Sequence, residues 1–298
     1  MKRIWILFLA SALLLLSGCS RLAADAALTA DRTLSAIEVY PSSFDVNTTW
    51  DDGEAVFISL ADGASTSTGS GAMIEGDVIT IKAGGDYVIS GSLTDGQICV
   101  ELDKTEKAHL ILNGVSVSSA ETAPLYVVAA DKVCITTVGG TENIFSDESR
   151  TRPADDDLKH NLNACIYAAD DISFNGAGTL TVKAYNNGIG CKNDVRICGG
   201  TVDINARQNG IKGRNSVYIS AGTVNTKAGK DGLKSTNAAE PLKGFVAVVG
   251  GDVTIHAMDD GIQAITDVIV NNCSLTLRAA DDKINSFGAR HLDLNCIH

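Results

Sequence analysis

The sequence predicts an all-β protein whose strands form a parallel β-helix with about 22 residues per coil. Three observations lead to this fold class. A 22-residue repeat runs through the second half of the chain, its copies alternate apolar and polar residues with period two, and no apolar stretch after the first 19 residues has helical spacing. A copy of this length cannot bury its own apolar face, so copies must stack on one another. A β-propeller is disfavoured, because its blades need about 40 to 45 residues.

Each copy has one internal plan: a turn, an apolar pair such as Val195/Ile197, a Gly-Gly-Thr corner, and a second pair such as Val202/Ile204. The copies open on NGI at 187–189, NGI at 209–211, DGL at 231–233, DGI at 260–262 and DKI at 282–284. An insertion at 238–243 explains the one step of 29 residues. Equivalent residues should stack about 4.8 Å apart. Two interior ladders are therefore expected, one of Val195, Val217 and Val268 and one of Val202, Val224, Val253 and Leu275.

The first 19 residues have the pattern of a secretion signal, with Lys2 and Arg3 before an apolar run from Ile4 to Leu16. The run is too short for a transmembrane helix. The segment LSGC at 16–19 resembles a bacterial lipobox, which implies cleavage before Cys19 and lipidation of its sulfur. We therefore expect a signal peptide at 1–19, a polar tether at 20–49 and a repeat domain at 50–298. The mature protein is expected to be an extracellular, monomeric lipoprotein that touches the cell membrane through its lipid alone.

Net charge limits the classes of partner, and cysteine content limits the kinds of site. The net charge is −12, and it becomes −14 when Lys2 and Arg3 are removed with the signal. Nucleic acid and anionic membrane surfaces are therefore poor partners, and an acidic ligand needs bridging cations. The seven cysteines that follow Cys19 are odd in number and lack C-x-x-C spacing, so they indicate neither a disulfide framework nor a zinc site. We interpret them as core residues, with one or two disulfides left open.

Aligned copies place acidic and amide residues in two rows at the turns. The first row is Asn187, Asn209, Asp231, Asp260 and Asp282, and the second is Asn186, Gln208, Lys230, Asp259 and Asp281. Asn and Asp before Gly are ordinary turn residues. Carboxylates stacked about 4.8 Å apart, however, repel by roughly 3 kcal/mol per pair at an effective dielectric near 20. We therefore predict a Ca²⁺ site on Asp231, Asp259, Asp260, Asp281 and Asp282, because calcium binds oxygens at about 2.3–2.6 Å whereas magnesium demands tighter octahedral geometry. Solvated, screened turns are the alternative.

A third row follows the turns and consists of Gly190, Lys212, Lys234, Gln263 and Asn285. With Lys192 and Arg214 nearby, the stacked Lys212 and Lys234 are candidates for holding substrate carboxylates. Either of these two lysines, with its pKa lowered by the other, is also a candidate base. Two solvated lysines that balance the nearby acids are the alternative.

Eight motifs resemble those of a known family, the bacterial, largely clostridial, lipoprotein-type carbohydrate-binding domain-containing proteins. They are GSLTDGQI at 91–98, LILNGV at 110–115, ADKV at 130–133, GTEN at 140–143, NGI at 187–189, NGIKGR at 209–214, DGLKS at 231–235 and DDGIQA at 259–264. The resemblance implies a right-handed parallel β-helix similar to pectate lyases, with calcium at the Asp-Gly turns and pectin-like or cellulose-type ligands. Two features depart from it: the pattern dissolves after Phe287, which suggests truncation, and Lys283 replaces the glycine of the other late copies.

Three functions follow as hypotheses. The first is calcium-dependent binding of an acidic plant polysaccharide such as polygalacturonate at the cell surface. It is favoured over cellulose binding because the mature chain keeps a single tryptophan, Trp50. The second is a pectate-lyase-like enzyme in which Lys212 or Lys234 abstracts the proton next to a uronate carboxylate. The third is a structural or adhesive surface repeat. We expect a binding protein rather than an enzyme.

Overall fold

The computed structural model describes residues 41–150 and 162–298, so the expected signal peptide, Cys19 and most of the tether lie outside the described residues. The first elements are α2 (Ser43–Val46), β1 (Val56–Leu60), β2 (Thr66–Ser67), β3 (Ala72–Glu75), β4 (Val78–Ile81), β5 (Gly85–Leu93), β6 (Gln97–Glu101), β7 (Lys107–Ser118), β8 (Leu125–Ala129), β9 (Lys132–Thr137) and β10 (Glu142–Ser146). There follow β11 (Ala164–Ala168), β12 (Asp171–Gly176), β13 (Thr179–Ala184), β14 (Asn187–Cys191), β15 (Asp194–Ala206), β16 (Ile211–Gly213), β17 (Ser216–Ala228) and β18 (Leu233–Ser235). The last are β19 (Phe245–Val248), β20 (Asp252–Ala257), β21 (Ile262–Ala264), β22 (Val268–Val270), β23 (Ser274–Ala279), β24 (Ile284–Ser286), β25 (Arg290–Leu292) and the 3₁₀ helix η3 (Leu294–Cys296). No helix in this part of the chain is long and apolar enough to cross a membrane.

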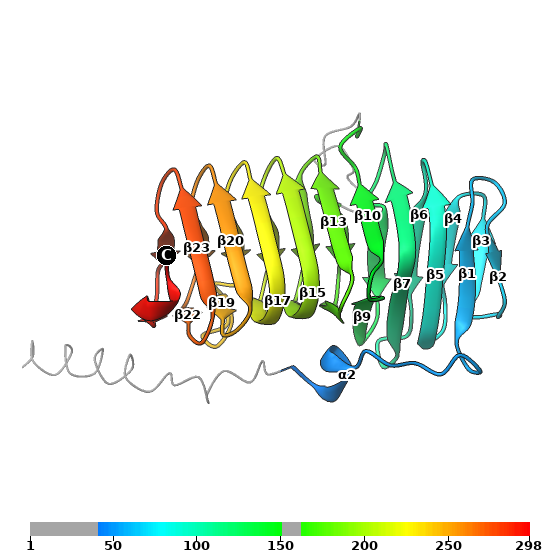
Figure 1. Cartoon of the computed structure of the whole chain (residues 1–298), viewed down its shortest axis with the longest axis horizontal. Coiled ribbons are helices and arrows are strands. Elements are labelled where there is room, and N and C mark those ends of the chain that lie inside the picture. The colour runs from blue at the N-terminus through cyan, green and yellow to red at the C-terminus, as the bar shows by residue number, and fades with distance from the viewer. Residues whose placement is uncertain (1–40, 151–161) are drawn as a thin grey trace, which may run out of the picture. The chain divides into compact units, whose positions relative to one another are not determined.

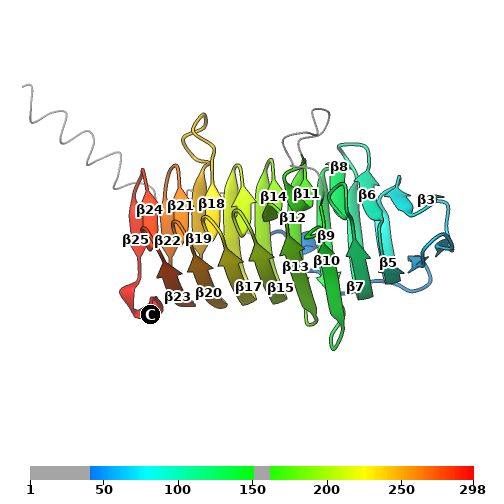
Figure 2. The ribbon, with the colours of Figure 1, turned by 90° about the horizontal axis from the view of Figure 1, so that it is seen from above.

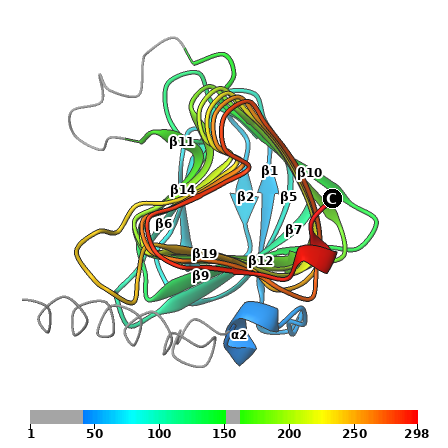
Figure 3. The ribbon, with the colours of Figure 1, turned by 90° about the vertical axis from the view of Figure 1, so that its left-hand side faces the viewer.

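The strands form two sheets, as Figures 1 and 2 show. The first is a fifteen-stranded sheet, and the second has ten strands in the order β24-β21-β18-β16-β14-β11-β8-β6-β4-β3. We call the second the ten-stranded sheet. Neighbouring strands are parallel except for β1 with β2 and β3 with β4. Seen end-on in Figure 3, the ten-stranded sheet, the strands around β9 and β12, and the strands around β7 and β10 enclose the core from three sides.

The predicted fold class is corrected by the strand pairing. The chain is all-β, but it is not the regular right-handed parallel β-helix that the repeat predicted. Six parallel strands close into a ring in the order β7-β10-β13-β15-β12-β9, and β9 pairs again with β7. The ring closes because the long strands β7 and β15 each pair with two strands on the same side of the stack. The architecture is therefore a closed barrel-like core of six parallel strands that continues into sheets.

The corner predicted within each copy is the physical reason for this difference. Gly199 and Gly200 were expected to end a strand, yet both lie inside β15, which has 13 residues. Strand pairing is shifted between Ile197 and Thr201, and Gly200 has a φ of 75°. A bulge of this kind bends a strand without ending it. One strand thus serves two faces, which a pattern of short strands and corners does not predict.

The predicted repeat spacing holds in only part of the molecule. Ile197 pairs with Ile219, and Val248 with Val270, both at the predicted step. Toward the N-terminus the steps are longer, because Val56 pairs with Tyr87, Leu110 with Ile135, and Ile135 with Phe174. Beyond Phe287, where the sequence pattern dissolves, Arg290–Leu292 still pair with β22. A regular coil length is therefore a property of the later copies alone.

Both predicted ladders of apolar residues are confirmed. Val195 pairs with Val217, and Val246 connects Val217 to Val268. The second ladder runs from Val202 to Leu275 in the predicted register. These side chains are buried in one continuous core, together with Cys165 and Cys191. All seven cysteines after Cys19 are free and none is fully exposed, as expected for packing residues.

Helix α2 packs against β12 and β15 and belongs to the same compact unit as the strands, although residues 41–49 were assigned to the tether. Asp45 of α2 is fully buried and accepts a hydrogen bond from Lys132 Nζ at 2.9 Å. Asn175 Nδ2 donates to the backbone oxygens of Asp45 and Asn47 at 2.9 and 2.8 Å. The packed unit therefore includes residues 41–49.

Candidate functional site

The first row of turn residues is built into the backbone hydrogen bonding of the repeat. The side-chain oxygen of each member accepts a hydrogen bond from the backbone N–H of the next member, at 3.2 or 3.3 Å, all along Asn187, Asn209, Asp231, Asp260 and Asp282. The first four side chains of this turn row are buried. A buried amide hydrogen needs an acceptor, and Asn and Asp both offer a side-chain oxygen at the same place. The row therefore has a structural role that both residue types fulfil.

The predicted repulsion between stacked carboxylates is offset by nearby donors. Lys234 Nζ donates to Asp231 Oδ2 at 2.6 Å, and the Asp231 side chain is fully buried. Asp260 Oδ2 accepts hydrogen bonds from the amides of Gln263 and Asn285, at 2.9 and 2.8 Å. The positive charge expected at this corner is thus supplied at least in part by Lys234. We call the third row (Gly190, Lys212, Lys234, Gln263 and Asn285) the lysine row. Through these hydrogen bonds the lysine row and the turn row form one connected network.

Three of the five predicted calcium ligands come together. Ligand oxygens of Asp231, Asp259 and Asp260 all lie within 4.8 Å of one another. Asp281 and Asp282, on the last copy, are exposed and do not join this group. The charge of Asp231, followed by burial and the charges of Asp260 and Asp281, raises the pKa of Asp259. The three carboxylates thus concentrate negative charge at this corner.

The three carboxylates fit a hard cation in donor type and in spacing, since one ion with oxygens at about 2.3–2.6 Å can join groups this close. One condition follows from the hydrogen bonding. Asp231 Oδ2 already holds Lys234, and Asp260 Oδ2 already holds two amides. A cation at this position would therefore share Asp231 with Lys234 or displace the ammonium group. Asp259 is partly exposed and is the open side of the cluster.

The predicted lysine row lies on the outward side of the ten-stranded sheet. Gly190 pairs with Lys212, Lys212 with Lys234, Lys234 with Gln263, and Gln263 with Asn285. Burial first, and then the charges of Lys234 and Lys230, lower the pKa of Lys212. Lys234 is committed to Asp231, whereas Lys212 has no salt bridge within the residues that the structure describes. Lys212 is thus the lysine of this pair that is available to an anion.

The other two predicted binding residues lie just beyond the strand ends. Lys192 follows β14 and Arg214 follows β16, and both side chains are exposed. The backbone N–H of Arg214 donates to the oxygen of Cys191 at 2.9 Å, which places the two residues on neighbouring copies. Arg214 also contributes, after Lys243 and Asn237, to the lowered pKa of Glu240 in the insertion at 238–243. Lys192 and Arg214 therefore extend the cationic side of the ten-stranded sheet toward the insertion at 238–243.

An aromatic pair on the same face was missed. Tyr126 pairs with Tyr167 across β8 and β11, and Tyr167 pairs with Gly190. The two rings meet edge to face, 5.9 Å apart at 60°. Burial raises the pKa of Tyr167 to about 12. The pair continues the lysine row toward the N-terminus, but the two tyrosines lie farther apart in sequence than one repeat, so a search at the repeat length did not reveal their equivalence.

Comparisons with known proteins identify relatives that cover most of the packed unit. A family model described as carbohydrate-binding domain-containing protein matches residues 75–292. A carbohydrate-binding domain-containing protein from Acetivibrio thermocellus is 44% identical over 220 residues, which are 74% of this chain and 77% of that protein. A solved structure of a polysaccharide lyase-like protein from C. thermocellum, a gadolinium derivative, is 36% identical with a TM-score of 0.77 and covers 82% of this chain and 98% of its own.

Proposed function

This chain belongs to the family of carbohydrate-binding domain-containing proteins, and from this premise we propose that it binds an acidic polysaccharide with the help of Ca²⁺. The proposed surface is the outward side of the ten-stranded sheet, and polygalacturonate is the proposed class of ligand. The observation that carries the proposal is the stacking of Lys212 and Lys234 beside the buried carboxylates of Asp231 and Asp260. The protein would act at the cell surface, held by a lipid on Cys19.

The net charge of the protein explains why both Ca²⁺ and lysine side chains are needed to bind the ligand. A chain of net charge −12 repels an acidic polymer at long range, so binding requires local positive charge. Lys212, which is half-buried and free of a salt bridge among the described residues, offers a charge-assisted hydrogen bond to a uronate carboxylate. Tyr126 is half-buried, packs on the buried ring of Tyr167 farther along the same row, and offers an apolar ring to a sugar.

Calcium is proposed at Asp231, Asp259 and Asp260. Its role would be to neutralise this acidic corner and to join protein carboxylates to ligand carboxylates. The structural neighbour was solved as a gadolinium derivative, and gadolinium, like calcium, is a hard cation that prefers oxygen ligands. That observation supports a hard-cation site on this fold without locating it. Calcium shared with Asp231 would also weaken the hold of this carboxylate on Lys234, which would then face the ligand.

A second candidate function is polysaccharide lyase activity by β-elimination. It is favoured by the lowered pKa of Lys212, whose neutral amine is a competent base, and by the lyase-like description of the structural neighbour. Lys212 would take the proton next to the uronate carboxylate, the bond from the ring to the leaving oxygen would break as the carbon–carbon double bond forms, and the leaving oxygen would take a proton from water. Calcium would stabilise the carboxylate that carries the developing charge.

Isothermal titration of the purified protein with oligogalacturonate, in calcium and again in chelator, tests the proposal, while absorbance near 235 nm is followed on the same samples. We expect calcium to strengthen binding and Lys212→Gln to weaken it about tenfold. Lys104→Gln, an exposed lysine on another part of the chain, is the matched control. Binding that is indifferent to both calcium and Lys212 would contradict the proposal. Rising absorbance that is lost with Lys212→Gln would establish the lyase instead.

A further inference from the structure

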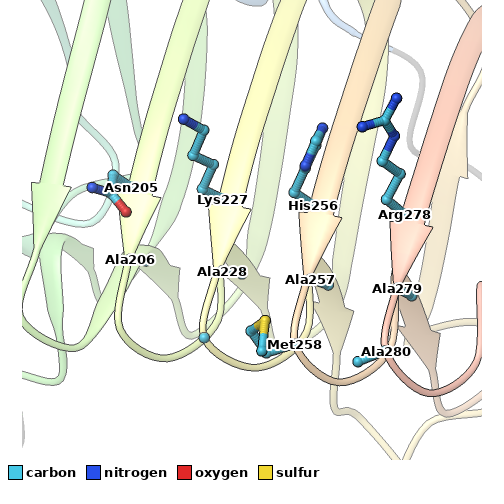
Figure 4. A pocket seen from close by; sticks show the side chains of 11 residues that line it. Asn205, Ala206, Lys227, Ala228, His256, Ala257, Met258, Arg278, Ala279 and Ala280 are labelled. Carbon is cyan, nitrogen blue, oxygen red and sulfur yellow. The ribbon is translucent and has the colours of Figure 1, made fainter.

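A second row, of mostly basic residues, lies on the fifteen-stranded sheet, four residues before the turn row in each copy. Strand pairing aligns its members across β13, β15, β17, β20 and β23 as Lys183, Asn205, Lys227, His256 and Arg278. We call this set the basic row. Its members point outward from neighbouring strands, as Figure 4 shows for the last four. Because adjacent strands lie about 4.8 Å apart, Lys227 and Arg278 are roughly 10 Å from each other along the stack.

The basic row borders an open groove at the ends of these strands. The groove has a volume of about 600 Å³ and is lined by Asn205, Lys227, His256, Arg278, Met258 and a set of alanines. Ala206, Ala228 and Ala257 are the last residues of their strands and are buried, whereas Ala279 is half-buried and Ala280 is exposed, so no bulky side chain fills the groove. Met258 is 72% exposed and offers an apolar surface beside the charges. Cationic groups beside an apolar floor suit a sugar ring that carries an anionic group.

A second cavity continues the groove along the same row. It has a volume of about 400 Å³, shares Asn205, Lys227 and His256 with the first, and extends to Lys183. Asp203 is the one carboxylate that lines it, and Asp203 Oδ1 accepts a hydrogen bond from Asn225 at 2.7 Å. The combined groove therefore runs across several strands and is positive along one edge. An extended chain lying across the strands fits this arrangement better than a compact ligand.

The charges of the basic row are not neutralised by the protein. Across residues 41–150 and 162–298, neither Lys227 nor Arg278 forms a salt bridge or a hydrogen bond through its side chain, whereas Lys234 and Arg196 are paired with carboxylates. Both side chains are exposed. Unpaired cations at regular intervals on a protein of net charge −12 form a local positive strip. Such a strip attracts an anion that carries charges at similar intervals.

We propose that the groove beside Lys227, His256 and Arg278 is a second binding site for an acidic polysaccharide, and that it works without calcium. A uronate polymer carries one carboxylate on each sugar, and the length of one ring is comparable to the strand spacing. Successive carboxylates can then meet successive members of the row, while the ring faces lie on Met258 and Ala280, which are exposed. The inference shares its ligand class with the proposed function but rests on different residues and a different sheet.

The test is titration of the protein with hexagalacturonate in chelator, which removes the calcium-dependent contribution. We expect the double variant Lys227→Gln/Arg278→Gln to lose about tenfold or more in affinity, because two charge-assisted contacts are removed. The double variant Lys104→Gln/Arg290→Gln removes the same amount of charge from other exposed positions and should bind as the parent does. All four side chains of the two double variants are exposed, so unchanged thermal melting is the expected check on folding.

Each other outcome has a distinct meaning. Equal loss in both double variants would show that overall charge, and not the groove, attracts the ligand, and would overturn the inference. Equal affinity for cellohexaose would remove the role of the carboxylates, and equal affinity for a short single-stranded DNA would remove the role of the sugar. If calcium-dependent binding fails on the ten-stranded sheet but the groove variants still lose affinity in chelator, the proposed function falls and this inference stands.

Discussion

The turn row and the basic row come from the same repeat and are only four residues apart in sequence. The charges of Asp231 and Asp260 in the turn row are buried and hydrogen-bonded. Those of Lys227 and Arg278 in the basic row are exposed and unpaired among the described residues. At Asp231 the carboxylate is fully buried, accepts the backbone N–H of Asp260 and holds Lys234. At Lys227 the ammonium is exposed and has no ion pair within the described chain. A repeat thus supplies one row of polar residues that completes the backbone hydrogen bonding and a second that remains free for a ligand. The turn row therefore contributes to stability, whereas the basic row has no such structural role.

Substitution at the two rows should separate these roles most clearly. We expect Asp231→Ala to lower the free energy of unfolding by about 3 kcal/mol, because it leaves the N–H of Asp260 without its acceptor and Lys234 without its partner. Lys227→Ala should change it by less than about 0.5 kcal/mol. Urea denaturation followed by circular dichroism measures both. Similar losses at the two positions would refute the division of roles.

Asp45 tests whether buried pairing, rather than membership of the turn row, carries the stability. Burial alone would raise the pKa of Asp45, but hydrogen bonds from Lys132 and Ser42 outweigh it and lower the pKa below the ordinary 3.8. A carboxylate with a lowered pKa in the folded state stabilises the fold above pH 3.8 and loses that contribution as the pH falls through the folded-state pKa. We therefore expect Lys132→Met to cost about 2 kcal/mol at neutral pH and progressively less in acid below that value.

The control for this pH dependence is the exposed pair of Lys82 and Glu101, whose side chains are 40% and 51% accessible. Lys82→Met should cost less than about 0.5 kcal/mol, because solvent screens exposed pairs. Unfolding free energies measured between neutral pH and acid would compare the two. A cost of Lys132→Met that stays constant in acid would show that Asp45 does not stabilise α2 through its charge.

Ionic strength should produce the smallest of these effects and should act on the groove alone. Raising salt from about 0.1 M to about 1 M shortens the screening length from about 10 Å to about 3 Å. Hexagalacturonate binding in chelator should then weaken several-fold, which corresponds to about 1 kcal/mol. The melting temperature should barely change, because the pairs at Asp231 and Asp45 are buried. Salt-insensitive binding in the groove would mean that the basic row does not contact the ligand.

The sequence was sufficient for the strand content, the stacking and the alignment of the later copies. The predicted ladders and the register of Lys212 with Lys234 are confirmed because the apolar pattern and the turn residues recur there at the same repeat length. The basic row could have been found in the same alignment, since each of its members precedes an alanine at a fixed distance from the turn. Cations at exposed strand positions are common on any sheet, so nothing in the sequence distinguishes these residues from ordinary solvated charges.

Two other features could not be predicted from the repeat. The closed ring of six strands depends on β7 and β15 bending without ending, and glycine corners look the same in sequence whether a strand stops or continues. The Tyr126/Tyr167 pair depends on copies of unequal length, whose equivalence is visible only once the strands are paired. The local sequence pattern predicts the secondary structure of each segment. The strands with which that segment pairs are decided by tertiary packing.

The hydrogen bonds of the turn row also have a direction along the chain. Each side-chain oxygen in the row serves the backbone of the copy that follows it in the chain and not the copy before it. A copy that has just emerged during synthesis therefore finds its acceptor already in place on the copy made before it. Folding can proceed as a vectorial process from the N-terminal to the C-terminal copies, in step with the order in which the ribosome makes them.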